Sequence, residues 1–208
     1  MSSKPEQHRG WYTTRRIPHF DAAHTFQFIS FRLGDSLPPT VLSDMKAEAD
    51  MRSTSEKSTA LRSRMEAFLD RGYGCCLLAE PEMAAQLGQA FNYYDGRRYE
   101  LIAWCVMPNH VHILIKPMTS LSRIVQGWKT WSARWAYQHA QQLHLQMPPN
   151  GFWMRGYWDR YIRDEIHFHA AIAYIHQNPV KAGLCSRAQD WVWSSAKQSE
   201  CGLRPVNP

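Results

Sequence analysis

The alternation of hydrophobic and polar residues predicts four strands along the chain. Residues 24–33 (HTFQFISFRL), 98–106 (RYELIAWCV) and 110–116 (HVHILIK) are rich in β-branched and aromatic residues, as strands are. Residues 152–163 (FWMRGYWDRYIR) are aromatic and predict a fourth strand. The short MPN link joins the second and third strands, so these two form an antiparallel hairpin.

Segments with the helical spacing of apolar residues lie between these strands and after the last of them. They are residues 61–70, a segment that begins near Pro81, and residues 120–143 and 164–177. The apolar face of the third of these helices is formed by Leu121, Ile124, Val125, Trp128, Trp131 and Trp135. The proline of NPVKAGL is expected to end the last helix.

The order of elements predicts an α+β fold with a ferredoxin-like (RRM-like) βαββαβ core, an antiparallel sheet and an added C-terminal helix. Such a core has helices on one face of its sheet, and we expect the other face to be free for chemistry. Residues 1–23 are interpreted as a basic N-terminal arm with little regular structure, 24–197 as a single domain with an insertion candidate at 36–62, and 198–208 as a tail.

Composition narrows the class of protein. Lys and Arg number 24 against 18 Asp and Glu, a net charge of +6 that favours a polyanionic partner. The five cysteines form no Cys-x-x-Cys pair and no secretory signal opens the chain, so we expect reduced thiols in a cytoplasmic protein. No apolar run is long enough for a membrane helix.

Two histidines stand one residue apart in VMPNHVHILI (106–115). On a strand, His110 and His112 share one face, while Val111, Ile113 and Ile115 face the helix-covered core. Two such histidines are most often surface residues of a half-exposed strand. Alternatively, they converge on one metal ion and leave it open to a substrate.

A tyrosine and an amide on the last predicted helix suit such a metal site. Tyr174 and Asn178 are four residues apart and share a helix face. Tyr174 is either a nucleophile or an amphipathic residue at the edge of the core. The carbonyl oxygen of Asn178 would be a third ligand and make the site hard enough for Mg²⁺ or Mn²⁺, with Gln177 as a competing amide.

The order of four segments resembles a known family. VMPNHVHILI, GYWDRYIRDE, YIHQNPVKAGL and DWVWSS together resemble the REP-associated tyrosine transposases, which belong to the IS200/IS605-like single-tyrosine transposases with a His-hydrophobic-His (HUH) motif. The resemblance covers roughly residues 10 to 197. It implies cleavage of single-stranded DNA through a 5′-phosphotyrosine intermediate, with REP-type hairpin DNA as substrate. By position, it assigns His110, His112 and Asn178 to the metal and Tyr174 to the nucleophile.

Basic and aromatic residues are interleaved between residues 120 and 163, as binding of single-stranded nucleic acid requires. Trp128 and Trp135 fall on the apolar helix face and are expected in the core. Arg15 and Arg16 of the arm could enter the groove of a DNA hairpin. The predicted DNA-binding residues are Arg15, Arg16, Arg123, Lys129, Arg155, Tyr157, Trp158, Arg160 and Arg163.

Three alternatives remain open. Tyr161, on the strand before the tyrosine helix, is a rival nucleophile. The chain could be a nucleic-acid-binding protein derived from a transposase and without catalysis, or a phosphodiesterase that uses water. We expect a bacterial cytoplasmic protein, nucleoid-associated when bound to DNA, and a monomer rather than a homodimer, although no dimer surface can be recognised in the sequence.

Overall fold

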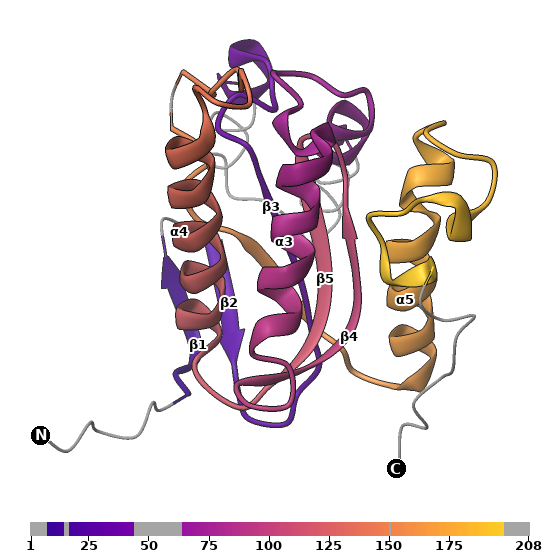
Figure 1. Cartoon of the computed structure of the whole chain (residues 1–208). Coiled ribbons are helices and arrows are strands. Elements are labelled where there is room, and N and C mark those ends of the chain that lie inside the picture. The colour runs from indigo at the N-terminus through magenta and orange to yellow at the C-terminus, as the bar shows by residue number, and fades with distance from the viewer. Residues whose placement is uncertain (1–7, 15–16, 44–63, 150, 198–208) are drawn as a thin grey trace, which may run out of the picture.

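A four-stranded antiparallel sheet organises the structure, a computed structural model that describes residues 8–14, 17–43, 64–149 and 151–197. The strand order is β4-β5-β3-β6. Helices α3 (Pro81–Tyr93) and α4 (Leu121–His139) lie side by side over one face (Figure 1). The strands are β3 (Gln27–Arg32), β4 (Tyr99–Val106), β5 (His110–Pro117) and β6 (Trp158–Tyr161). This topology confirms the predicted ferredoxin-like α+β fold.

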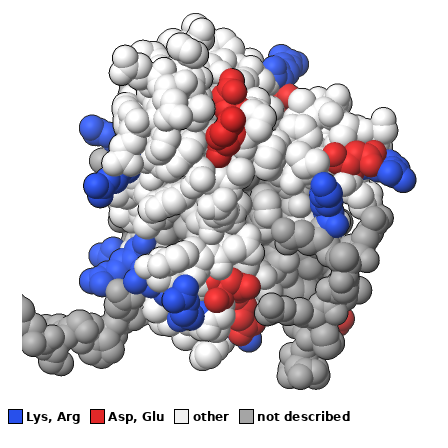
Figure 2. All heavy atoms as spheres, in the orientation of Figure 1, with Lys and Arg blue, Asp and Glu red and all other residues white. Residues whose placement is uncertain are grey.

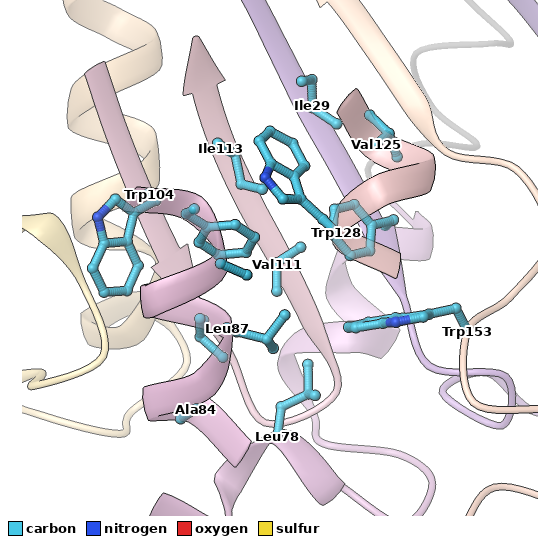
Figure 3. Close-up of a cluster of buried hydrophobic side chains, with 14 of the residues drawn as sticks. Ile29, Leu78, Ala84, Leu87, Trp104, Val111, Ile113, Val125, Trp128 and Trp153 are labelled. Atoms are coloured by element: carbon cyan, nitrogen blue, oxygen red, sulfur yellow. The ribbon is translucent and has the colours of Figure 1, made fainter. Parts of the chain in front are cut away.

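The face under α3 and α4 holds the larger core. Val111, Ile113 and Ile115 are fully buried on this side, as the strand alternation predicts. Trp128 extends from α4 toward the sheet, and its indole N–H donates to the Tyr99 hydroxyl at 3.0 Å (Figure 3). The predicted core position of Trp128 is confirmed, whereas Trp131 of the same predicted face is 43% exposed.

The opposite face of the sheet is covered as well, so the expectation of a free face is wrong. Helix α5 (Glu165–Lys181) packs on it and lies beside β4 in Figure 1. The buried residues between α5 and the sheet are Phe28, Ala103, Cys105, Met107, Leu114, Ile162, Ala171 and Ile175. Any site on this face is therefore enclosed between the sheet and α5.

Helix α5 also runs through Pro179, where the sequence predicted its end. Pro179 lies in the last turn of the helix. The helix is closed there by hydrogen bonds from Gly183 N to Val180 O (3.0 Å) and from Leu184 N to Pro179 O (2.9 Å). Gly183 adopts a φ of 72°, the left-handed conformation that this type of helix end uses. Asn178 consequently remains helical and stays one turn beyond Tyr174.

The N-terminal segment is not an irregular arm. Strands β1 (Gly10–Thr14) and β2 (Ile17–Asp21) form an antiparallel hairpin within the predicted arm of residues 1–23. The hairpin is held on β6, because the Asp159 carboxylate accepts hydrogen bonds from His19 Nδ1 and from Phe20 N, the latter at 3.2 Å. Most of the insertion candidate (36–62), and all of the predicted tail (198–208), lie outside the described residues.

Residues 191–195, which we name the C-terminal strap, tie α5 to the outer edge of β4. The Trp193 carbonyl of the strap accepts a hydrogen bond from Val106 N (2.8 Å), and the Ser195 hydroxyl accepts one from Trp104 N (2.9 Å). The same hydroxyl bonds His176 Nε2 of α5 at 2.9 Å. The predicted packing of this irregular segment on the domain is confirmed. None of the described helices has both the length and the apolar character needed to cross a bilayer.

Candidate active site

The two histidines lie on the central strand β5 and face α5. Each is only 1% exposed. They are paired with the polar side of β3, because His112 lies opposite Ser30 and His110 opposite Arg32. Their Nε2 atoms are 3.0 Å apart, so both imidazoles point at one spot between the sheet and the helix.

The hydrogen bonds of Asn109 determine the tautomer of His110. The Asn109 amide nitrogen donates to the Tyr73 carbonyl at 3.0 Å, so its oxygen is the atom that faces His110 Nδ1 at 2.7 Å. His110 must therefore carry its proton on Nδ1. Burial and the nearby Arg32 and Lys181 charges lower the pKa of His110 to about 3. The imidazole is thus neutral, and its Nε2 presents a lone pair, as a metal ligand requires.

Tyr174 lies directly against this pair. Its ring centroid is 5.3 Å from that of His112. Phe28 of β3 contacts both rings, at 5.8 Å from Tyr174 and 5.5 Å from His112. The helix and the sheet therefore bring the predicted nucleophile and the predicted metal-binding residues together.

The rival tyrosine lies on the opposite face of the sheet. Tyr161 contacts Phe20 of the N-terminal hairpin, with ring centroids 5.0 Å apart, and Trp11, at 5.9 Å. Its neighbour Arg160 instead lines a pocket together with Tyr174. Because successive residues of a strand alternate in direction, Tyr161 points away from His110 and His112.

Asn178 is buried one helical turn beyond Tyr174. It is 1% exposed, and among the residues that the structure describes neither its amide oxygen nor its amide nitrogen has a hydrogen-bond partner. A buried amide without partners destabilises a fold by about 1–3 kcal/mol per group, so such a group calls for an explanation, of which a functional role or a bound ion is one. Gln177, the competing amide, is exposed. Of the two amides, only Asn178 is therefore directed into the interior.

A pocket of about 170 Å³ opens beside Tyr174, on the same side of the sheet. Its walls come from β3, β6 and the first half of α5. They consist of Phe28, Arg160, His167, Ala170, Ala171 and Tyr174.

Most residues of this site lie within a segment that matches a known protein family. The sequence pattern of the family described as "Transposase IS200 like" matches residues 78–178, from the turn before α3 to Asn178. The matched range includes both histidines and the tyrosine. This segment of the chain is thus similar to an IS200-like transposase domain. The segment contains five of the six elements of the ferredoxin-like core and α5 as far as Asn178.

Individual relatives point the same way. The chain is 28% identical over 111 residues to a putative REP-associated tyrosine transposase of Haemophilus influenzae, covering 47% of this chain and 58% of the relative. It is 29% identical over 112 residues to the REP-associated tyrosine transposase of Escherichia coli, covering 53% of this chain and 63% of the relative. In both cases it spans less than two thirds of the relative. The resemblance to REP-associated tyrosine transposases is thus confirmed.

A solved structure agrees in fold. It is a REP-associated tyrosine transposase bound to a REP hairpin, and it superposes with a TM-score of 0.52 at 16% identity. The likeness extends over 100% of this chain and 89% of that chain. The likeness in fold therefore includes the N-terminal hairpin and the C-terminal strap as well as the segment 78–178.

Four of the predicted DNA-binding residues are exposed: Arg123, Arg155, Arg160 and Arg163. Trp158 is half-buried against Phe28, with ring centroids 5.8 Å apart. Arg15 and Arg16 lie outside the described residues. Figure 2 shows basic side chains at the margin beside α4 and small groups of acidic and basic side chains elsewhere on that face.

Two of the predicted DNA-binding residues form hydrogen bonds with other parts of this chain. Lys129 Nζ donates to the carbonyls of Met154 and Gly156, each at 2.6 Å. The Tyr157 hydroxyl bonds that of Tyr12 at 2.8 Å, and burial raises the pKa of Tyr157. Both side chains join segments of this chain, and their role as DNA contacts stays a prediction.

Three residues of the site were not recognised in the sequence. Asn109 immediately precedes the histidine motif, and its place in PNHVH was the available signal. Phe28 lies on the histidine-facing side of β3, which requires knowledge of the register between β3 and β5. His167 is seven residues before Tyr174, two helical turns away on the same face.

The donor atoms fit a hard divalent cation bound through few protein ligands. No group of three or more His, Cys, Asp or Glu residues forms a metal site in the part of the chain that the structure describes. His110, His112 and Asn178 instead offer two imidazole nitrogens and one amide oxygen. Such a set leaves coordination positions for substrate oxygens, as Mg²⁺ and Mn²⁺ sites in phosphoryl-transfer enzymes do.

Proposed function

We propose that this protein is a metal-dependent endonuclease and strand transferase that acts on single-stranded, REP-type hairpin DNA through a 5′-phosphotyrosine intermediate. The observation that carries the proposal is the contact between Tyr174 and His112, with their ring centroids 5.3 Å apart in a buried site. The hairpin in the solved relative supports the class of substrate.

In the proposed reaction, the Tyr174 hydroxyl loses its proton and attacks the phosphorus of a DNA phosphodiester. The new bond joins the tyrosine oxygen to phosphorus. The bond from phosphorus to the 3′-oxygen breaks, and that oxygen takes up a proton to leave as a 3′-hydroxyl. The 5′-phosphotyrosine preserves the diester, so a 3′-hydroxyl of the same or another strand can reverse the step and join the ends.

His110, His112 and Asn178 are the residues that would hold the cation. A bound Mg²⁺ or Mn²⁺ would neutralise the charge that develops on the phosphate oxygens. Asn109 holds His110 in the tautomer with a free Nε2 lone pair. Helix α5 and Phe28 hold the tyrosine ring in place beside His112.

The test is a denaturing gel with end-labelled single-stranded hairpin DNA and either Mn²⁺ or Mg²⁺. The wild-type protein is expected to form a covalent protein–DNA adduct. Tyr174→Phe is expected to abolish the adduct, and His110→Ala is expected to abolish it by removing a ligand. Tyr161→Phe is the matched control, because Tyr161 lies on the opposite face of the sheet.

Other outcomes identify the alternatives. An adduct that persists in Tyr174→Phe would exclude Tyr174 as the nucleophile. Metal-dependent cleavage without any adduct indicates a phosphodiesterase that uses water. A retarded complex on a native gel, with neither adduct nor cleavage, indicates a hairpin-binding protein that has no catalytic activity.

A further inference from the structure

The pocket beside Tyr174 is not used by the proposed cleavage step. Phe28 forms its floor from β3, and Arg160 closes one side from the edge strand β6. Helix α5 contributes His167, Ala170, Ala171 and Tyr174. Because two of these helix residues are alanines, the helix leaves room where larger side chains would fill the gap.

The lining suits one nucleotide. An aromatic ring and two methyl groups form an apolar surface against which a nucleobase can pack. Arg160 brings a guanidinium, which binds phosphate oxygens with two N–H groups. None of the described residues that line the pocket is acidic.

His167 adds a polar group with a defined direction of hydrogen bonding. Its Nδ1 accepts from Arg163 N at 3.4 Å, so the neutral imidazole carries its proton on Nε2. The ring is therefore a donor toward acceptors on a base, such as a carbonyl oxygen or a ring nitrogen.

We propose that this pocket binds the nucleotide adjacent to the phosphate that Tyr174 attacks. Arg160 holds its phosphate, Phe28 packs on its base, and His167 favours a base with an acceptor at the edge it meets. The placement follows from Tyr174, whose side chain both lines the pocket and contacts His112. This inference rests on the proposed cleavage reaction and adds a site that selects the position of cleavage.

Two alanine substitutions on α5 provide a matched test. Ala170→Leu fills the pocket, whereas Ala173→Leu adds the same side chain to an exposed position of the same helix outside the pocket. Both positions are on the helix surface, so both variants are expected to fold, which thermal unfolding checks. Arg160→Gln and His167→Phe remove the two polar contacts separately.

The measurement is the rate of adduct formation against DNA concentration, for hairpins with an abasic residue on either side of the cleaved phosphate. In wild type and Ala173→Leu, one of the two abasic substitutions is expected to raise KM about tenfold, the effect of losing one stacked base. In Ala170→Leu, the intact substrate is expected to have the raised KM already, and the abasic residue to change it no further. His167→Phe is expected to reduce discrimination in a panel of the four bases at that position.

Two results would overturn the subsite: an unchanged KM for both abasic substrates in wild type, or an Ala170→Leu protein that behaves like Ala173→Leu. If wild type forms no adduct with any hairpin, the cleavage reaction fails independently. The same oligonucleotides are then compared by equilibrium fluorescence anisotropy. A penalty for the abasic residue in wild type that is absent in Ala170→Leu still supports the pocket, and its absence refutes it.

Discussion

Replacing Asn109 separates the two roles that its side chain has in this structure. The residue is fully buried, and it connects His110 Nδ1 to the Tyr73 carbonyl through hydrogen bonds of 2.7 and 3.0 Å. Asn109→Ala removes both bonds and leaves a buried imidazole N–H without its acceptor. We expect the free energy of unfolding to fall by about 2–3 kcal/mol, since each unsatisfied buried group costs about 1–3 kcal/mol.

The same variant is expected to weaken metal binding. Without the Asn109 oxygen, the His110 proton is no longer fixed on Nδ1, and the lone pair on Nε2 is no longer assured. Loss of such a supporting hydrogen bond weakens metal affinity by about 10–100-fold. Unfolding in urea with chelator present measures the stability effect alone, and calorimetric titration with Mn²⁺ measures the affinity.

Asn109→Asp is the informative control. A carboxylate still accepts from His110 Nδ1 but cannot donate to the Tyr73 carbonyl. This variant is therefore expected to lose stability and yet keep most of its Mn²⁺ affinity. If Asn109→Ala binds Mn²⁺ as tightly as wild type, or if both variants lose affinity equally, the role of Asn109 in setting the tautomer is refuted.

Three further changes test other contacts. Asn178→Leu removes a buried amide without partners, so it is expected to raise stability in chelator by about 1 kcal/mol or more while abolishing metal-dependent cleavage; a less stable variant would show that the amide has a partner in the fold. Ser195→Ala removes the hydroxyl that joins β4 and α5, and urea unfolding is expected to show a loss of about 1–3 kcal/mol, against no loss for the exposed Ser186→Ala. Gly127→Ala, in an open position of α4, is expected to raise the unfolding temperature through a gain of about 0.5–1 kcal/mol. Gly74→Ala is expected to lower it by about 2 kcal/mol, because Gly74 has a φ of +94° and an added Cβ would lie 2.8 Å from the Asp35 carbonyl oxygen; equal effects of the two glycine substitutions would contradict this reasoning.

The core of the fold could be predicted because its signals are local. The strands have alternating or β-branched sequences, and the proline at the start of α3 and the DG after it mark the ends of that helix. The division of β5 into a histidine face and an aliphatic face follows from strand geometry alone, and the structure has that division. The pairing of Tyr174 with Asn178 likewise needs only helical periodicity.

The position of α5 could not be predicted in the same way. Its apolar residues do not form one clear stripe, and Ile166 is 84% exposed. The face of the sheet on which a terminal helix packs is decided by tertiary contacts, here with Phe28 and Leu114. The same limit applies to the internal hydrogen bonds of Lys129 and Tyr157. Their types suit DNA, but only the folded chain brings the Met154 carbonyl and the Tyr12 hydroxyl to them.

The N-terminal hairpin was missed for a local reason. Its strands are five residues each, and Pro18 within the second argues against a strand from sequence alone. The hairpin becomes stable by packing on β6, which is far away in the sequence. Pro179 led to the prediction that α5 ends too early. A proline in the last turn of a helix removes only one backbone hydrogen bond, at an end where carbonyl groups already lack partners within the helix.

The C-terminal strap has a consequence for synthesis on the ribosome. The strands of the sheet and the helices α3 and α4 all precede residue 162, whereas α5 and the strap that fastens it to β4 are made afterwards. Domains fold as units while the chain emerges from its N-terminus. The nascent protein can therefore form the ferredoxin-like core with both histidines in place before Tyr174 is held against them. In the reaction that we propose, Tyr174 would be held against the histidines only when residues through Ser195 are free of the ribosome, so a chain still in translation would be folded but unable to cleave.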